Sequence, residues 1–388
     1  MTNALDDYAL MPLALSAIGR NPKSGSSLIV RAIALLGRVR QVPRILYLCP
    51  GLTQKAYGGK RRLYHHVDVL RGAGFDSFVV HARRGARLRW FDNETPILYA
   101  PIQVSTDDIL VFPEVYGERL YTIAPGIPRV SLNLNVFNWT PPSADRHGSL
   151  VLSNVTNSEY GEGVLKRLLP GQRIAKIVHG IDRKLWVPEL ERKRFKISYM
   201  PRKHPLLSQQ LTSVLASVAS PDWEIFGIDN LPEGEVSTHL QQSELFLSFS
   251  KLEGFGRPPV EAMACGASVI GFSGVAGREY FDVTSAHEVP QGDILAFAEA
   301  TADWLRLYKQ APEELHAQQM ADAKRMHQMY SMAQERVDLI GEFSDLQGLL
   351  HPNAVGTAVL KPVDIEPAAA LRRRVRVRAN RLRHRQIL

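Results

Sequence analysis

Short apolar runs alternate with helical patterns along most of this chain. Four runs that read as buried strands occupy residues 44–51, 77–81, 109–113 and 130–134, and a second series occupies 196–200, 223–227, 245–249 and 267–272. Between the first two runs, residues 63–70 have apolar positions at helical spacing. Strands that alternate with helices favour parallel sheets, so we expect an α/β protein with two Rossmann-like sheets.

The two series of runs divide the chain into five parts. Its 388 residues suit two domains at roughly 150 residues each. We expect a basic leader at 1–42, with apolar positions at helical spacing, and a Rossmann-like domain at 43–176. A second Rossmann-like domain is expected at 177–311, followed by helices at 312–350 and by a linker with an arginine-rich tail at 351–388. A helix in the leader would pack on the first domain or face a membrane.

The net charge of +8 is concentrated at the C-terminal end. Residues 371–388 contain eight arginines and no acid, which leaves 39 basic and 39 acidic residues elsewhere. A neutral body disfavours a nucleic-acid-binding protein, because a domain that follows phosphates needs its own basic face. A helical tail would place the arginines from Arg372 to Arg385 on an anionic membrane surface, whereas a disordered basic tail would have no fixed partner.

Cysteine usage and hydropathy predict a cytoplasmic protein. Cys49 and Cys265 fall in different predicted domains and are a poor basis for a disulfide framework. The most apolar N-terminal stretch, residues 9–18, is interrupted by Pro12 and is far shorter than the ~20 residues of a membrane span. With the arginine tail, this pattern predicts a peripheral enzyme on the inner face of the cytoplasmic membrane.

Two glutamates with a glycine loop between them follow the run at 245–249. Glu253 lies at the predicted strand exit, and the paired prolines Pro258 and Pro259 suit the first turn of a helix, a turn in which we also place Glu261. Carboxylates accept hydrogen bonds from vicinal hydroxyls, so one glutamate can bind a ribose and the other a sugar. Gly254 and Gly256 would let the backbone approach that sugar closely.

A nucleotide sugar at this helix N-terminus would direct its diphosphate towards the positive end of the helix dipole. Arg202 and Lys203, directly after the run at 196–200, can supply cations at the same sheet edge. Gly58 and Gly59 form a similar strand–glycine–helix unit in the first domain. Taken singly, Glu261 is an ordinary helix glutamate, Arg202 and Lys203 are a solvated charge pair, and Gly58 with Gly59 is a turn. Each of these features follows a predicted strand, and their order along the chain favours a nucleotide-sugar site.

The run from Glu253 to Gly266 resembles the signature of glycosyltransferase family 4, in which two glutamates separated by seven residues precede an Ala-Met-Ala-Cys-Gly-like helix. The sequence Val-His-Gly-Ile-Asp at 178–182 is similar to the family's interdomain linker. Gly58 with Gly59 resembles its N-terminal glycine loop, and Arg202 with Lys203 its diphosphate-binding pair. Together these features cover about residues 44–345.

This resemblance implies a GT-B fold, two facing Rossmann-like domains, and transfer with retention of anomeric configuration by front-face substitution. It implies that Glu253 and the amides around Phe255 and Gly256 bind the donor sugar. It also implies that Glu261 binds the ribose, and that Arg202 and Lys203 are catalytic through the leaving diphosphate.

The chain departs from the family pattern at several positions. His179 replaces an asparagine of the linker, and Ser268 replaces a proline. No histidine of the first domain matches the family's catalytic one, because His65 and His66 lie in the first predicted helix, where a packing or solvated role is favoured. Strand ends that point towards the expected cleft make Glu114 and Asn135 acceptor-side candidates.

The sequence predicts no metal and no cofactor. It contains no Asp-x-Asp triplet, no His/Cys cluster with zinc-like spacing and no P-loop. We expect a retaining, metal-independent hexosyltransferase that uses a nucleotide diphosphate sugar and a glycan or lipid-linked acceptor of surface polysaccharide or lipopolysaccharide assembly. Two alternatives stay open: another GT-B enzyme, such as a phosphorylase or sugar-nucleotide epimerase, and a non-catalytic carbohydrate- or nucleic-acid-binding protein on this scaffold. The nucleotide and the linkage are left undecided.

Overall fold

A computed structural model of the protein describes residues 43–51, 58–139, 151–189, 191, 193–218, 220–350 and 356–366. The leader at 1–42 and the arginine-rich tail lie outside the described residues, and so do the helices and the membrane contact predicted for them. Within the described part of the chain, no helix is both long and apolar enough to cross a bilayer.

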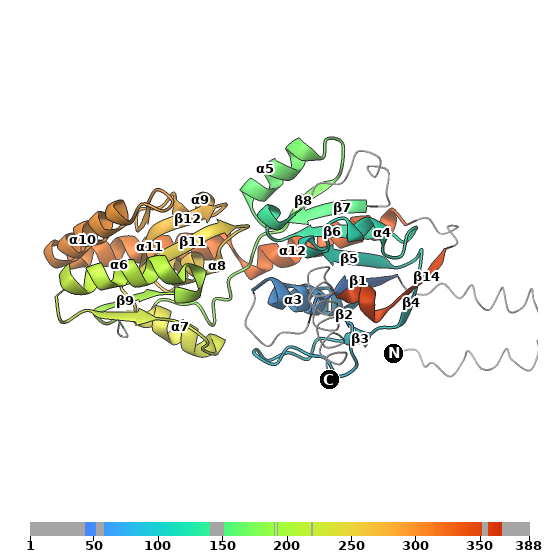
Figure 1. Ribbon diagram of the computed structural model, residues 1–388, viewed down its shortest axis with the longest axis horizontal. Helices are drawn as coiled ribbons and strands as arrows, with labels where there is room; N and C mark the ends of the chain where they lie inside the picture. The colour runs from blue at the N-terminus through green and yellow to red at the C-terminus, as the bar shows by residue number, and fades with distance from the viewer. Residues whose placement is uncertain are drawn as a thin grey trace, which may run out of the picture. The chain divides into compact units, whose positions relative to one another are not determined.

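The first sheet has seven parallel strands in the order β3-β2-β1-β5-β6-β7-β8 (Figure 1). Its strands are β1 (Arg44–Leu48), β2 (Asp76–His81), β3 (Ile97–Tyr99), β5 (Ile109–Pro113), β6 (Arg129–Asn133), β7 (Val151–Thr156) and β8 (Ile174–Lys176). The four predicted runs correspond to β1, β2, β5 and β6. Strands β3, β7 and β8 were missed. β3 and β8 are three-residue edge strands without a fully buried residue, and three of the four buried residues of β7 are polar, so none has a distinctive apolar run.

Helix α3 (Gly58–Gly72) covers this sheet and starts directly at the predicted glycine pair. Its residues Leu63, Val67 and Leu70 are fully or almost fully buried in the core of the first sheet. Between the later strands lie η2 (Glu114–Tyr116), α4 (Arg119–Thr122), η3 (Val136–Asn138) and α5 (Glu159–Leu168). The Ser158 side chain accepts a hydrogen bond from the Gly161 amide and so fixes the start of α5.

The second sheet has five parallel strands in the order β10-β9-β11-β12-β13. They are β9 (Lys196–Tyr199), β10 (Glu224–Gly227), β11 (Leu245–Glu253), β12 (Ser268–Val275) and β13 (Ala286–Glu288). The associated helices are η6 (Pro201–Lys203), α6 (Pro205–Val218), α7 (Glu233–Gln242), α8 (Arg257–Ala264), α9 (Arg278–Phe281) and α10 (Ile294–Gln310). Two parallel sheets with interleaved helices confirm the predicted α/β class.

The two helices after residue 311 pack on different cores. Helix α11 (Pro312–Met329) lies against α8, whereas α12 (Met332–Gly348) lies against α3 (Figure 1). Leu339 and Phe343 of α12 are buried with Leu63 in the core of the first sheet. The sequence indicated helices here but left open which sheet they would cover, and the structure shows that the chain returns to the first sheet through α12.

The linker predicted after residue 350 is wrong for residues 357–365. Strand β14 (Thr357–Leu360) pairs antiparallel with β4 (Ile102–Ser105), and α13 (Pro362–Ile365) follows it. Leu360 and Ile365 are fully buried, and the Tyr116 hydroxyl donates to the Ile365 carbonyl oxygen at 2.6 Å. Burial of a few apolar side chains against an existing sheet therefore orders this segment, although its own apolar pattern is too short to indicate a strand.

Candidate active site

A cavity of about 840 Å³ lies at the strand ends of both sheets. This volume is within the range of small-molecule sites in proteins. All the site residues predicted from the sequence line it: Gly58, Gly59, Glu114, Asn135, Arg202, Lys203, Glu253, Gly254, Phe255, Gly256 and Glu261. The structure thus brings together groups that are up to 203 positions apart in the chain.

The glycine turn between β11 and α8 needs both of its glycines. A Cβ atom at Gly254 would lie 2.0 Å from the Leu134 carbonyl oxygen, so only glycine fits where the turn meets the end of β6. Gly256 has a φ of +80°, and a Cβ atom there would lie 2.6 Å from the Tyr280 hydroxyl. That hydroxyl is 2.7 Å from the Phe255 carbonyl oxygen and 2.8 Å from that of Gly256. Tyr280 therefore holds the carbonyls of the turn and fixes its path along the cavity.

Glu253 and Lys203 form the closest charged pair in the second-sheet part of the cavity. Glu253 ends β11, Lys203 ends η6, and the Lys203 Nζ to Glu253 Oε1 distance is 2.5 Å. Both side chains are about one-quarter exposed, and Arg202 beside them is exposed. The pair is open to a ligand that could accept hydrogen bonds from the ammonium group and donate them to the carboxylate.

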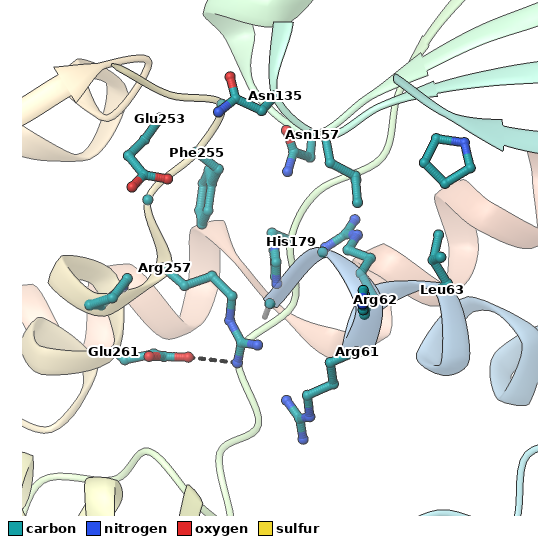
Figure 2. Close-up of a pocket in the computed structure, with 18 of the residues that line it drawn as sticks. Arg61, Arg62, Leu63, Asn135, Asn157, His179, Glu253, Phe255, Arg257 and Glu261 are labelled. Atoms are coloured by element: carbon teal, nitrogen blue, oxygen red, sulfur yellow. Dashed lines mark ion pairs between the residues drawn. The ribbon is translucent and has the colours of Figure 1, made fainter. Parts of the chain in front are cut away.

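Glu261 lies in the second turn of α8, not in the first turn as predicted. The helix begins at Arg257, one residue before the paired prolines, so Glu261 is its fifth residue. This offset places Glu261 four residues after Arg257, and their side chains form an ion pair at 2.6 Å (Figure 2). The Glu261 carboxylate nevertheless lines the cavity.

Glu114 and Asn135 belong to the first-sheet part of the cavity. Glu114 follows β5 and accepts a hydrogen bond from the Leu134 amide at 3.2 Å. Burial raises the pKa of the Glu114 carboxyl to about 7, against the opposing effect of the backbone amides around it. Asn135 Nδ2 donates to the Leu252 carbonyl oxygen at 3.1 Å, which joins the end of β6 to β11.

Several cavity residues were not singled out from the sequence. Arg61 and Arg62 follow the glycine pair on α3, Glu233 starts α7, and Arg257 starts α8. The spacing of Arg257 and Glu261 was the one available signal, because oppositely charged residues four apart face each other on a helix. Arg61 and Glu233 pair at 2.8 Å between residues 172 positions apart, a contact that no local pattern indicates.

His179, one of the departures from the family pattern, packs against the glycine turn. Its ring stacks on that of Phe255 with centroids 5.3 Å apart and planes 14° apart. Burial, together with the nearby charges of Arg62 and Arg257, holds the pKa of His179 well below its ordinary value. The imidazole is therefore neutral at pH 7 and serves as a flat wall of the cavity beside Phe255.

His65 and His66 do not line the cavity. They contact the buried carboxylate of Glu335 on α12, at 3.4 Å and 3.6 Å respectively. Their position agrees with the packing role favoured from the sequence. Among the described residues, no group of three or more His, Cys, Asp or Glu side chains is arranged to bind a metal ion.

Known proteins are similar to this chain in part of its sequence and in its fold. The family model for glycosyl transferases group 1 matches residues 222–325. An alpha-1,6-glucosyltransferase from Actinobacillus pleuropneumoniae serotype 7 is 26% identical over 270 residues, which are 66% of this chain and 81% of that protein.

Two solved structures illustrate the shared fold. Sucrose-phosphate synthase from Thermosynechococcus elongatus has a TM-score of 0.57 at 12% identity, over 79% of this chain and 100% of that one. The pneumococcal O-GlcNAc transferase GtfA, solved with UDP and GlcNAc, has a TM-score of 0.56 at 9% identity, over 80% of this chain and 99% of that one. The chain therefore contains a region similar to the group 1 glycosyltransferases at residues 222–325, and it has two parallel sheets in the GT-B arrangement.

Proposed function

We propose that this glycosyltransferase moves a hexose, glucose in the first instance, from a uridine diphosphate sugar to an acceptor hydroxyl with retention of configuration. The observation behind the proposal is that two carboxylates, a glycine turn and a cationic pair line one cavity. The glucosyltransferase activity named for the Actinobacillus relative supports the choice of glucose, and the UDP bound to the pneumococcal transferase supports the choice of nucleotide.

In this proposal the diphosphate lies at the start of α8, where unpaired backbone amides and the helix dipole favour negative charge. Lys203 and Arg202 neutralise the charge that develops on the leaving diphosphate, which lowers the barrier to breaking the glycosidic bond. Glu253, beside Lys203 at 2.5 Å, binds hydroxyls of the donor sugar, and Glu261 binds the ribose. The amides at Phe255 and Gly256 contact the sugar from the turn that Tyr280 holds.

For the acceptor, we propose a glycan or lipid-linked glycan of surface polysaccharide or lipopolysaccharide assembly. It would enter on the side of Glu114 and Asn135, the two candidates contributed by the first sheet. The eight arginines at residues 371–388 support an enzyme that works at an anionic membrane surface, where lipid-linked acceptors are found.

Release of UDP tests the proposed reaction. First, a thermal-shift screen of UDP, GDP and dTDP should raise the melting temperature with UDP most strongly, since a ligand that binds only the folded state stabilises it. UDP-glucose should then release free UDP in the presence of a panel of envelope glycans and lipid-linked glycans, and only slowly without them. Conversion of UDP-glucose into another nucleotide sugar without acceptor would instead identify an epimerase. UDP binding without turnover on any acceptor would favour the non-catalytic alternative.

The pKa of Glu114 predicts how the pH affects turnover. Below pH 7 the Glu114 carboxyl is protonated and cannot take a proton from an acceptor hydroxyl; above pH 7 it is ionised and can. We therefore expect kcat/KM to rise as the pH increases through about 7 and to level off above it. Glu114→Gln should remove this rise, whereas Glu118→Gln, at an exposed position outside the cavity, should keep it. An unchanged profile in Glu114→Gln would exclude Glu114 from the acceptor site.

A further inference from the structure

Four alternating charges connect three helices across the cavity. Arg61 of α3 pairs with Glu233 of α7 at 2.8 Å, Glu233 lies 3.9 Å from Arg257, and Arg257 pairs with Glu261 at 2.6 Å. All four residues line the cavity. Figure 2 shows the side chain of Arg257 extending from α8 towards α3 and then turning its guanidinium to Glu261.

The ion pair between Arg257 and Glu261 competes with the role proposed for Glu261. The guanidinium occupies one acceptor site of Glu261 Oε1 at 2.6 Å, which leaves fewer acceptor sites for ribose hydroxyls. The Arg257 side chain is 15% exposed and that of Glu261 is 7% exposed, so water screens this pair less than a surface pair. Two vicinal ribose hydroxyls that bind both oxygens of Glu261 would therefore compete with Arg257 for Oε1.

Arg257 has alternative anionic partners within reach. Glu233 Oε1 lies 3.9 Å from Arg257 Nη2, and Arg257 is the first residue of α8, beside the proposed position of the diphosphate. The start of α3 is also close, because a Cβ atom at Gly58 would lie 3.7 Å from Arg257 Cδ. Its Nε atom is buried and has no hydrogen-bond partner among the described residues, so the guanidinium has unused donor capacity.

We propose that Arg257 is an additional nucleotide-binding residue that leaves Glu261 for the donor diphosphate when the ribose hydroxyls bind Glu261. Glu233 keeps Arg257 and Arg61 near the cavity during this exchange. Arg257 thus opposes binding of a nucleoside that lacks phosphates and favours a nucleoside diphosphate. This inference rests on the proposed function, because it places the ribose at Glu261 and the diphosphate at the start of α8.

Uridine and UDP, titrated separately by calorimetry, distinguish this role from a structural one. Arg257→Leu should bind uridine about threefold more tightly, because Glu261 no longer has a competing partner. The same variant should bind UDP at least about tenfold more weakly, because a charged hydrogen bond to the diphosphate is lost. Arg257→Lys keeps a cation and should retain more of the UDP affinity than Arg257→Leu. Arg278→Leu is the control. Arg278 is the first residue of α9 and forms an exposed ion pair with Glu288, so its loss should leave the affinities for uridine and UDP unchanged.

Changes of the same sign for uridine and UDP in Arg257→Leu, or no change, would overturn the inference. If the wild-type chain bound neither uridine nor UDP, the proposed function would fail instead. Glu261→Ala tests the proposed ribose site separately from the exchange of Arg257. It should weaken uridine binding whether or not Arg257 changes partners.

Discussion

Lys203→Ala should lower kcat for transfer from UDP-glucose by about 100- to 1000-fold, the usual effect of removing a group that stabilises charge in a transition state. Lys203 is the cation nearest to the donor-sugar carboxylate, at 2.5 Å from Glu253. Its loss leaves the developing charge of the diphosphate less neutralised and also leaves Glu253 without its partner. Steady-state kinetics with a fixed acceptor would measure the effect.

Binding measurements separate this role from a general disturbance of the site. UDP affinity should fall in Lys203→Ala, while uridine affinity should remain, since uridine has no phosphate for Lys203 to contact. Lys251→Ala is the matched control, because Lys251 is an exposed lysine on the same strand as Glu253, two residues earlier, and does not line the cavity. Full activity in Lys203→Ala would show that the diphosphate binds elsewhere.

Those parts of the site that depend on local chain geometry could be predicted from the sequence. Glu253 and the glycines after it are adjacent to a strand whose apolar run is unmistakable, so their position at a sheet edge follows from the pattern alone. Arg202 and Lys203 follow the run at 196–200, so the same argument placed them at this sheet edge, and the resemblance to a known family then implied their role at the diphosphate. The position of Glu261 in α8 differs from the prediction by one residue, which moves it from the first turn to the second, because Arg257, rather than a proline, begins the helix.

Contacts between distant segments could not be predicted in this way. Whether Arg61 meets Glu233, or α12 meets α3, depends on how the sheets and helices pack, and no periodicity within either segment encodes the partner. The same holds for β14, which is a strand only because β4 offers an unpaired edge. Glu335 is another residue of this kind: its buried carboxylate joins α12 to α3 and to the segment before β9.

Glu335→Ala should lower the free energy of unfolding by about 3–5 kcal/mol, because it leaves a buried arginine without its counter-charge. Glu335 is 1% exposed and lies 3.2 Å from Arg62, which is 3% exposed and donates to the Ile177 and Val178 carbonyl oxygens. Glu335 also accepts a hydrogen bond from the Gly180 amide at 2.9 Å. Urea denaturation would measure the loss, and Glu335→Gln should lose less because it keeps that hydrogen bond.

Asp345→Ala is the control on the same helix: its pair with Arg173 is exposed, so removing it should cost less than about 1 kcal/mol. An equal loss in Asp345→Ala and Glu335→Ala would contradict a special role for the buried pair.

The pH dependence of stability gives a second check. Burial tends to raise the pKa of Glu335, but the charge of Arg62 and hydrogen bonds from His65 and His66 hold it well below its ordinary value.

A carboxyl with a depressed pKa stabilises the folded state above its unfolded pKa, and this stabilisation is lost as the pH falls through the folded pKa. The difference in stability between the wild-type chain and Glu335→Gln should therefore be constant near neutral pH and narrow below about pH 4.5, where the unfolded glutamate takes up its proton. Protonation of His66 lowers the free energy of unfolding of both proteins as the pH falls. Because burial lowers its pKa to about 4, the unfolded chain binds a proton that the folded chain does not between roughly pH 6.5 and 4. A difference that stayed constant down to pH 3 would show that the charge of Glu335 contributes nothing to holding α12 against α3.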